Sequence, residues 1–229
     1  MPTYKQIEFD IREALKEYRD DSELSSRYIM YLFGLKRSKY LRNDLNNLQK
    51  TIDTSILQTL CLELEEVSLS QCGIDITCET IMRTKQPIPK PLELHLKSAI
   101  TTVKAAIRLD VPFNFISKDR AVYAMNSTFN NSIYVFLDDD LHIYLISNAE
   151  ELKLLECITV TAIFENPLDL KNYRNCCKCT DLSSICFDES KTDYPIQAHH
   201  IDNIRTEIIK SLIGSLQIPE DKSNNSDDN

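Results

Sequence analysis

Residues 132–147 have the sequence S-I-Y-V-F-L-D-D-D-L-H-I-Y-L-I-S, two runs of alternating apolar side chains around three aspartates. Two β-branched and aromatic runs with a short polar break predict a β-hairpin. Because both faces of each run are largely apolar, we expect the hairpin to be central in its sheet and covered on each side. Asp138, Asp139 and Asp140 lack the glycine and the later glutamate of a calcium loop, so they are interpreted as a turn.

The first fifty residues predict two amphipathic helices. Apolar residues recur every three or four positions from Tyr4 to Tyr18, which predicts a first helix ending near Arg19. Asp21 or Ser22 is a candidate N-cap for a second helix that extends to about Gln49. Neither apolar stripe is wide enough for an independent core, so this hairpin needs the sheet or a neighbouring subunit. The apolar positions expected on the second helix are Leu24, Tyr28, Leu32, Leu35, Leu41, Leu45 and Leu48.

The middle of the chain predicts strands and one more helix. Alternation predicts strands at 60–65, 80–83, 113–117, 121–125 and 157–164. Pro87, Pro89 and Pro91 exclude a helix or central strand and predict an extended joint at 87–91. The spacing of Leu92, Leu96, Ile100, Val103 and Ile107 predicts a helix laid across the sheet. Asn166-Pro167 predicts a short helical turn.

The C-terminal segment predicts a helix followed by a polar tail. A stripe from Ile201 to Leu216 predicts a helix at 199–218 that packs on the sheet, and Pro219 ends it. Residues 219–229 are polar and have little apolar surface to bury. The predicted fold is therefore α+β, with a helical hairpin at 1–50, a mainly antiparallel β-meander and covering helix at 51–198, and the helix and tail.

Composition narrows the classes of function. The net charge of −9 argues against a nucleic-acid-binding surface over the whole chain. No apolar run approaches the roughly 20 residues of a membrane span. Only three glycines are present, which excludes glycine-rich phosphate loops. The N-terminal residues do not resemble a signal peptide, so the eight cysteines are expected to be thiols rather than a disulfide framework.

One cluster of basic residues stands out against the acidic remainder. It contains Lys36, Arg37, Lys39 and Arg42, with Arg27 a few turns earlier. Such a run is commonly a solvated helical face. The alternative is a docking face for an acidic partner protein or a DNA backbone.

Metal binding and catalysis have weaker signals. Cys176, Cys177, Cys179 and Cys186 contain one C-x-x-C spacing, and with His199 and His200 they could form a tetrahedral zinc site. A second paired knuckle is missing, so we expect free thiols, no stoichiometric metal and no cofactor. No local signature selects a catalytic cysteine–histidine pair.

The order and spacing of several segments resemble a known family. These segments are 20–33 (D-D-S-E-L-S-S-R-Y-I-M-Y-L-F), 58–67 (Q-T-L-C-L-E-L-E-E-V), 83–94 (R-T-K-Q-P-I-P-K-P-L-E-L), 112–124 (P-F-N-F-I-S-K-D-R-A-V-Y-A), 163–170 (I-F-E-N-P-L-D-L), 192–196 and 208–229. Together they resemble the neck, or head-to-tail connector, proteins of crAss-like and related tailed phages. The resemblance spans almost the whole chain, although no single motif is chemically diagnostic.

This resemblance implies a non-enzymatic virion protein. The implied assembly is a ring of about twelve copies below the portal protein, in contact with other neck and tail ring proteins, through which packaged double-stranded DNA passes. It implies assembly in the host bacterial cytoplasm and no membrane partner. Pro219, Glu220 and Asp221 are expected to be fixed by a neighbouring chain. The alternatives are a small zinc-binding, nucleic-acid-associated regulatory protein and a cysteine hydrolase.

Overall fold

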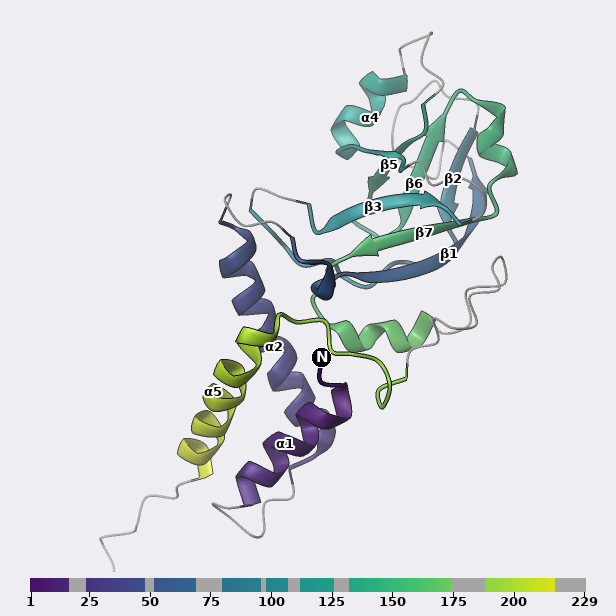
Figure 1. Ribbon diagram of the computed structural model, residues 1–229. Helices are drawn as coiled ribbons and strands as arrows, with labels where there is room; N and C mark the ends of the chain where they lie inside the picture. Colours follow the sequence, from purple (N-terminus) through teal and green to yellow (C-terminus); the bar gives the residue numbers. More distant parts are fainter. Residues whose placement is uncertain are drawn as a thin grey trace, which may run out of the picture.

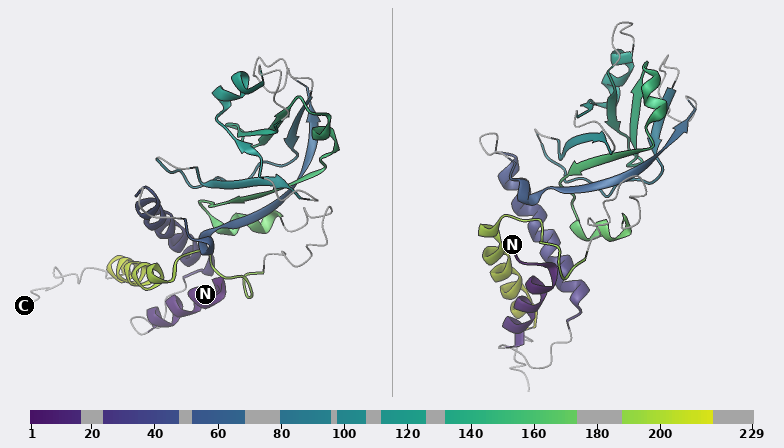
Figure 2. Two further views of the ribbon diagram at one scale, coloured as in Figure 1. Left: turned by 45° about the horizontal axis from the view of Figure 1, so that its top comes forward. Right: turned by 45° about the vertical axis from the view of Figure 1, so that its right-hand side comes forward.

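The computed structural model describes residues 1–16, 24–47, 52–68, 80–95, 98–106, 112–125, 132–173 and 188–216. A layer of three helices lies at one end and a curved sheet at the other (Figure 1). The helices are α1 (Tyr4–Lys16), α2 (Ser26–Leu45) and α5 (Ala198–Leu216). The two turned views show the same separation of helices from sheet (Figure 2). The predicted α+β fold is confirmed.

The helical layer differs from the prediction in two respects. Helix α2 begins later than expected, because the hydroxyl of Ser25 accepts a hydrogen bond from the backbone N–H of Tyr28 and caps the helix there. Helix α5 was expected to pack on the sheet, but it packs against α1 and α2. Its buried residues Ile204, Ile208 and Leu212 face those two helices as part of the main core. The predicted stripe of α1 is confirmed, with Tyr4, Ile7, Ile11 and Leu15 buried.

The sheet has seven strands in the order β3-β7-β1-β2-β6-β5-β4. The strands are β1 (Gln58–Val67), β2 (Thr80–Thr84), β3 (Ile100–Ala105), β4 (Asn114–Phe115), β5 (Tyr134–Leu137), β6 (Ile143–Ser147) and β7 (Cys157–Ala162). Only the β4–β5 pair is parallel among these strands, so the expected antiparallel pairing is confirmed. The order is not that of a simple meander, because β7 lies between β3 and β1.

Strand β1 joins the two halves of the sheet. Its first part, Gln58 to Glu63, pairs with β7, and its second part, Leu64 to Val67, pairs with β2. The two edge strands of the sheet, β3 and β4, approach each other. The N–H of Phe113 donates to the carbonyl of Val103 at 2.7 Å, and Lys104 and Pro112 form an isolated β-bridge. The sheet therefore curves until it nearly closes on itself.

The predicted hairpin is confirmed, but it lies toward one end of the sheet, next to the edge strand β4, rather than at its centre. Strands β5 and β6 pair from Tyr134 opposite Ile146 to Leu137 opposite Ile143, and β6 also pairs with β2. One face of the hairpin contributes to the main core, and the other contributes to a smaller core beneath α4 (Lys118–Met125). The turn uses a left-handed residue, Leu141, with a φ of 62°.

Two predicted elements are wrong. In the helix expected at 92–107, residues 100–105 instead form strand β3, since the run Ile100-Thr-Thr-Val103 is β-branched and favours a pleated strand. Leu96 and Ile107 of the expected stripe lie outside the described residues. The strand expected at 121–125 belongs to helix α4, which buries Ala121 against the hairpin. The covering helix therefore exists but comes from a different segment.

Short segments connect these elements. Three 3₁₀ helices are η1 (Thr54–Ile56), η2 (Glu150–Leu154) and η3 (Pro167–Tyr173). Helix η3 is the turn predicted at Asn166-Pro167. The segment 87–91, predicted to be an extended joint, contains no helix and is fastened to its neighbours. The N–H of Ile88 donates to the carbonyl of Leu141, and the carbonyl of Lys90 accepts from the N–H of Glu165.

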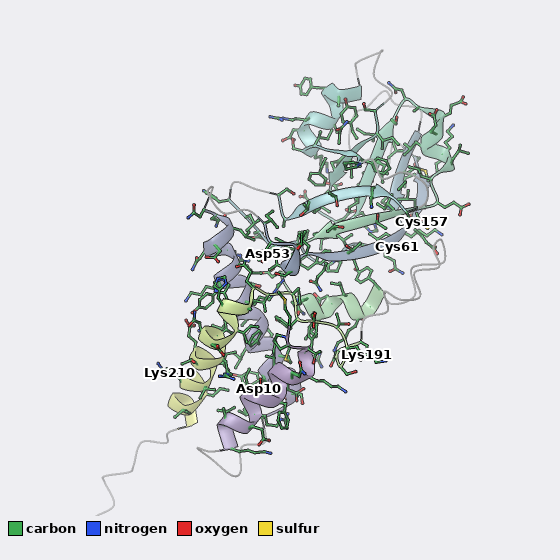
Figure 3. All side chains as sticks on the ribbon, viewed as in Figure 1. Asp10, Asp53, Cys61, Cys157, Lys191 and Lys210 are labelled. Atoms are coloured by element: carbon green, nitrogen blue, oxygen red, sulfur yellow. The ribbon has the colours of Figure 1, made fainter. Side chains whose placement is uncertain are left out.

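The described cysteines lie on neighbouring strands. Cys61 is on β1 and Cys157 is on β7 (Figure 3). Cys61 is buried, whereas Cys157 is disulfide-bonded, so the expectation of thiols throughout the chain is wrong at Cys157. Cys176, Cys177, Cys179 and Cys186 lie outside the described residues.

Candidate assembly interface

Arg37, predicted on a docking face, is an internal residue. Its side chain is 0% exposed. The guanidinium donates from Nε to the carbonyl of Pro195 at 2.7 Å and from Nη1 to the carbonyl of Phe164 at 2.9 Å. Burial lowers the pKa of Arg37 from its ordinary value. Arg37 therefore joins α2 to two distant segments and cannot contribute to an exposed face.

Aromatic side chains surround the buried guanidinium. Its central carbon lies 5.9 Å from the ring centroid of Tyr194. The Tyr194 ring makes edge-on contacts with Tyr4 at 4.7 Å and with Phe33 at 5.0 Å. The ring faces favour a cation and the edge-on geometry favours aromatic pairs. This cluster connects α1 and α2 to the segment before α5.

Tyr194 carries a prediction about alkaline stability. Its hydroxyl is buried without a hydrogen-bond partner among the described residues, and burial raises the pKa of Tyr194 to about 12. The unfolded phenol titrates near pH ~10, so the neutral ring stabilises the fold fully below that pH, and this contribution is lost as pH rises through the folded pKa. We expect the Tyr194→Phe variant to have the same free energy of unfolding as the wild type at neutral pH. As the pH rises into the alkaline range, the variant should lose less of this free energy than the wild type does.

Urea unfolding at neutral and alkaline pH checks this expectation. Tyr123→Phe is the control, because Tyr123 on α4 is 78% exposed. Loss of its hydroxyl should change the free energy of unfolding at neither pH. A loss above about 1 kcal/mol for Tyr194→Phe at neutral pH would show that the hydroxyl makes a stabilising hydrogen bond, against this account.

Two further predicted basic residues are paired within the chain. Lys36 lies 3.0 Å from a carboxylate oxygen of Glu207 on α5, and the hydroxyl of Tyr40 donates to the same carboxylate at 2.6 Å. The hydrogen bond from Tyr40, and after it the one from Lys36, lowers the pKa of Glu207. Arg42 lies 2.7 Å from Glu165. Both basic side chains are half-buried. Lys36 joins α2 to α5 and Arg42 joins α2 to the segment after β7, so they connect parts of the subunit more than they present charge to a partner.

The exposed face of α2 has a different composition from the predicted one. Arg27 and Lys39 are exposed and form no salt bridge within the described part of the chain. Between them lie three exposed apolar side chains, of which Tyr31 is 58% and Leu35 is 51% exposed. We call these five residues the α2 outer stripe: Arg27, Tyr28, Tyr31, Leu35 and Lys39.

Sequence reasoning placed Tyr28 and Leu35 in the core, which is wrong. The buried face of α2 instead contains Ile29, Phe33 and Leu41. A helix that is apolar on more than one side has a second surface to cover. The spacing of Tyr28, Tyr31 and Leu35 could have revealed that second surface, since positions three, four and seven apart share a helix face.

A groove of about 570 Å³ adjoins the outer stripe at the start of α2. Helix α1, helix α2 and η3 line it, and Arg27 and Tyr31 belong to both groove and stripe. Its other charged residues include Glu8, Asp169 and the ion pair of Lys171 with Glu189. The mixed charge and the aromatic ring suit a polypeptide better than a nucleic-acid backbone, which needs a uniformly basic surface.

Comparison with known proteins decides the class of protein. A family model described as phage tail ring protein 2 matches residues 6–229. The chain belongs to this family. The resemblance to ring proteins of crAss-like phages is thereby confirmed, and the chain is a structural ring protein of a phage virion.

A similar ring protein is known from a named phage. The chain is 26% identical over 234 residues to Ring protein 2 of Bacteroides phage crAss001, and the match covers 99% of this chain and 97% of that relative. The predicted interface residues Pro219, Glu220 and Asp221 of this ring protein lie outside the described residues. No described helix is long and apolar enough to span a membrane.

Proposed function

We propose that this ring protein forms a ring of about twelve copies in the phage neck, between the portal and the tail, that continues the DNA channel. Its partners are further copies of itself, the portal protein and other neck or tail ring proteins. Its role is structural rather than catalytic. Assembly takes place in the host bacterial cytoplasm.

The observation that carries this proposal is the α2 outer stripe in a family of ring proteins. Tyr28, Tyr31 and Leu35 are large apolar side chains exposed on one helix face. A closed ring needs a heterologous contact, in which one patch of each subunit meets a different patch of the next. We assign the outer stripe to one side of that contact, and Arg27 and Lys39 to acidic residues of the neighbouring copy. Lys36, Arg37 and Arg42 then stabilise the subunit itself.

The overall charge supports passage of DNA. The net charge of −9 gives a field that repels phosphates. A basic lumen would hold the DNA backbone by releasing its counterions, whereas an acidic lumen lets the duplex slide. DNA therefore passes without sequence-specific contacts.

The division of the chain follows from the same proposal. Residues 1–50 form an assembly arm, 51–198 the α+β core with its joint at 87–91, 199–218 the C-terminal helix, and 219–229 a tail that binds a neighbouring copy. The described helices and sheet share one continuous core, so arm and core fold together. Assembly then uses surfaces rather than independently folded domains.

Truncation separates the roles of helix and tail. A chain that stops after Ile218 should fold normally and assemble less stably, because only tail contacts to the neighbour are removed. A chain that stops before Ile201 should aggregate, because α1 and α2 lose the buried side chains of Ile204, Ile208 and Leu212. Sedimentation and circular dichroism measure both. Normal assembly of the chain that stops after Ile218 would contradict the role given to Pro219, Glu220 and Asp221.

The neck position has its own test. The purified protein is mixed with its portal protein, and native mass measurement and electron microscopy record the complexes. We expect a ring stacked coaxially on the portal. A ring that forms but never binds the portal would place the protein elsewhere in the virion.

A further inference from the structure

Three side chains of types that can bind metals lie close together where the end of α2 meets the start of α5. Asp44 lies in the last turn of α2, and His199 and His200 lie in the first turn of α5. One ligand atom from each residue lies within 4.8 Å of the other two. Asp44 is far in sequence from the adjacent residues His199 and His200, and the packing of α5 on α2 brings them together. Sequence reasoning paired His199 and His200 with cysteines, and Asp44 was not considered.

The distances suit a small cation after modest adjustment. Nε2 of His200 lies 2.7 Å and Nε2 of His199 lies 3.8 Å from the same oxygen, Oδ2 of Asp44. Zinc bonds of about 2.0–2.1 Å in a tetrahedral site place neighbouring ligand atoms roughly 3.3 Å apart. The contact of His200 with Asp44 must open and that of His199 with Asp44 must close, each by about half an ångström. The exposed side chain of His199 has room to make the second change, whereas the first needs a small shift of the covered pair.

The burial of the three side chains is graded from inside to outside. His200 is buried, the side chain of Asp44 is mostly covered, and the side chain of His199 is 64% exposed. Nδ1 of His200 is buried without a hydrogen-bond partner among the described residues. The exposed side gives a cation a path of entry and leaves one coordination position for water.

We propose that Asp44, His199 and His200 bind one Zn²⁺ ion, with water as the fourth ligand. Two imidazole nitrogens and one carboxylate oxygen are a donor set that zinc accepts in proteins. The ion would take the place of the hydrogen bond between His200 and Asp44. It would pin the first turn of α5 to the last turn of α2 and so stabilise the helical layer that carries the outer stripe. This inference does not depend on the position of the ring in the virion.

Titration with zinc chloride tests the site in the full-length chain. Because the cysteines can also bind zinc, the titration is repeated with Cys176, Cys177, Cys179 and Cys186 changed to Ser. We expect one zinc ion per chain in both proteins. In each, zinc should raise the midpoint of thermal unfolding, since a ligand that binds the folded state stabilises it.

The decisive variant is His199→Ala. This side chain is largely exposed, so its removal should leave the fold intact. The variant should bind zinc at least about tenfold more weakly, since even outer partners of metal ligands contribute about that much. Asp44→Asn should weaken binding as well. His95→Ala is the matched control, because His95 is exposed and does not belong to this cluster, and it should bind as the wild type does.

Two results would overturn the proposal. One is an absence of zinc binding in the cysteine-to-serine protein, and the other is equal affinity of His199→Ala and the wild type. Cobalt substitution gives an independent measurement on the unmodified chain. Nitrogen and oxygen ligands give visible absorption without the thiolate charge-transfer band in the near ultraviolet, and a strong band of that kind would assign the metal to cysteines instead.

Discussion

Arg37→Ala is expected to lower the free energy of unfolding by about 3 kcal/mol. The substitution leaves the carbonyls of Pro195 and Phe164 without their donors in a buried setting. It also removes the side-chain volume that packs beside Tyr194 and so creates a cavity there. In the wild type, burial of the cation costs free energy and lowers the pKa of Arg37. The substitution removes this cost, which offsets only part of the loss.

Comparison variants identify the cause. Arg37→Met should cost less than Arg37→Ala, because it refills the volume while still removing the donors. Lys39→Ala changes an exposed residue of the same helix and should shift stability by less than about 0.5 kcal/mol. Urea unfolding of the three variants measures the differences. If Arg37→Ala were as stable as the wild type and failed only to assemble, Arg37 would be a docking residue after all.

The second large effect concerns assembly rather than folding. The double substitution Tyr31→Ser and Leu35→Ser should prevent ring formation at concentrations where the wild type assembles. Burial of each side chain at an interface contributes about 1.5–3 kcal/mol. Loss of both should therefore weaken each contact between copies by at least about a hundredfold. The isolated subunit should keep its stability, because both side chains are mainly exposed.

A second exposed pair serves as the control for this effect. Tyr123 on α4 and Leu154 on η2 are more exposed than the stripe residues and belong to elements that pack on the sheet rather than on α2. Tyr123→Ser with Leu154→Ser should leave ring formation unchanged. Sedimentation velocity compares the two double variants. Normal rings from the stripe variant would show that the outer stripe does not hold copies together.

Regular alternation or regular helical spacing made parts of the fold predictable. The hairpin at 132–147 alternates without interruption on both sides of its turn, and α1 repeats Tyr4, Ile7, Ile11 and Leu15 without a competing period. Residues 92–107 satisfied a helical spacing by coincidence. There, the β-branched side chains of Ile100 and Val103 and the pairing of β3 with β7 decided the conformation. Tertiary pairing of this kind has no local signal.

The predicted interface residues also show that the sequence alone does not reveal which side chains distant segments cover. Arg37 and Lys39 are two positions apart on one helix, and the sequence gives both as members of a basic cluster. Arg37 is internal because the segment at 194–195 crosses that side of α2 and presents a carbonyl to it. Phe33 is core and Tyr31 is surface for the same reason. Which face of an apolar helix is covered depends on partners far along the chain.

A reconstruction of the assembled ring by electron cryo-microscopy tests the central claim most directly. The claim is that copies of this protein form a closed ring through the α2 outer stripe. The account predicts about twelve subunits, with Tyr28, Tyr31 and Leu35 of each copy buried against the next and Arg27 and Lys39 beside acidic groups of that neighbour. A closed ring in which these five side chains face solvent or the lumen would contradict it.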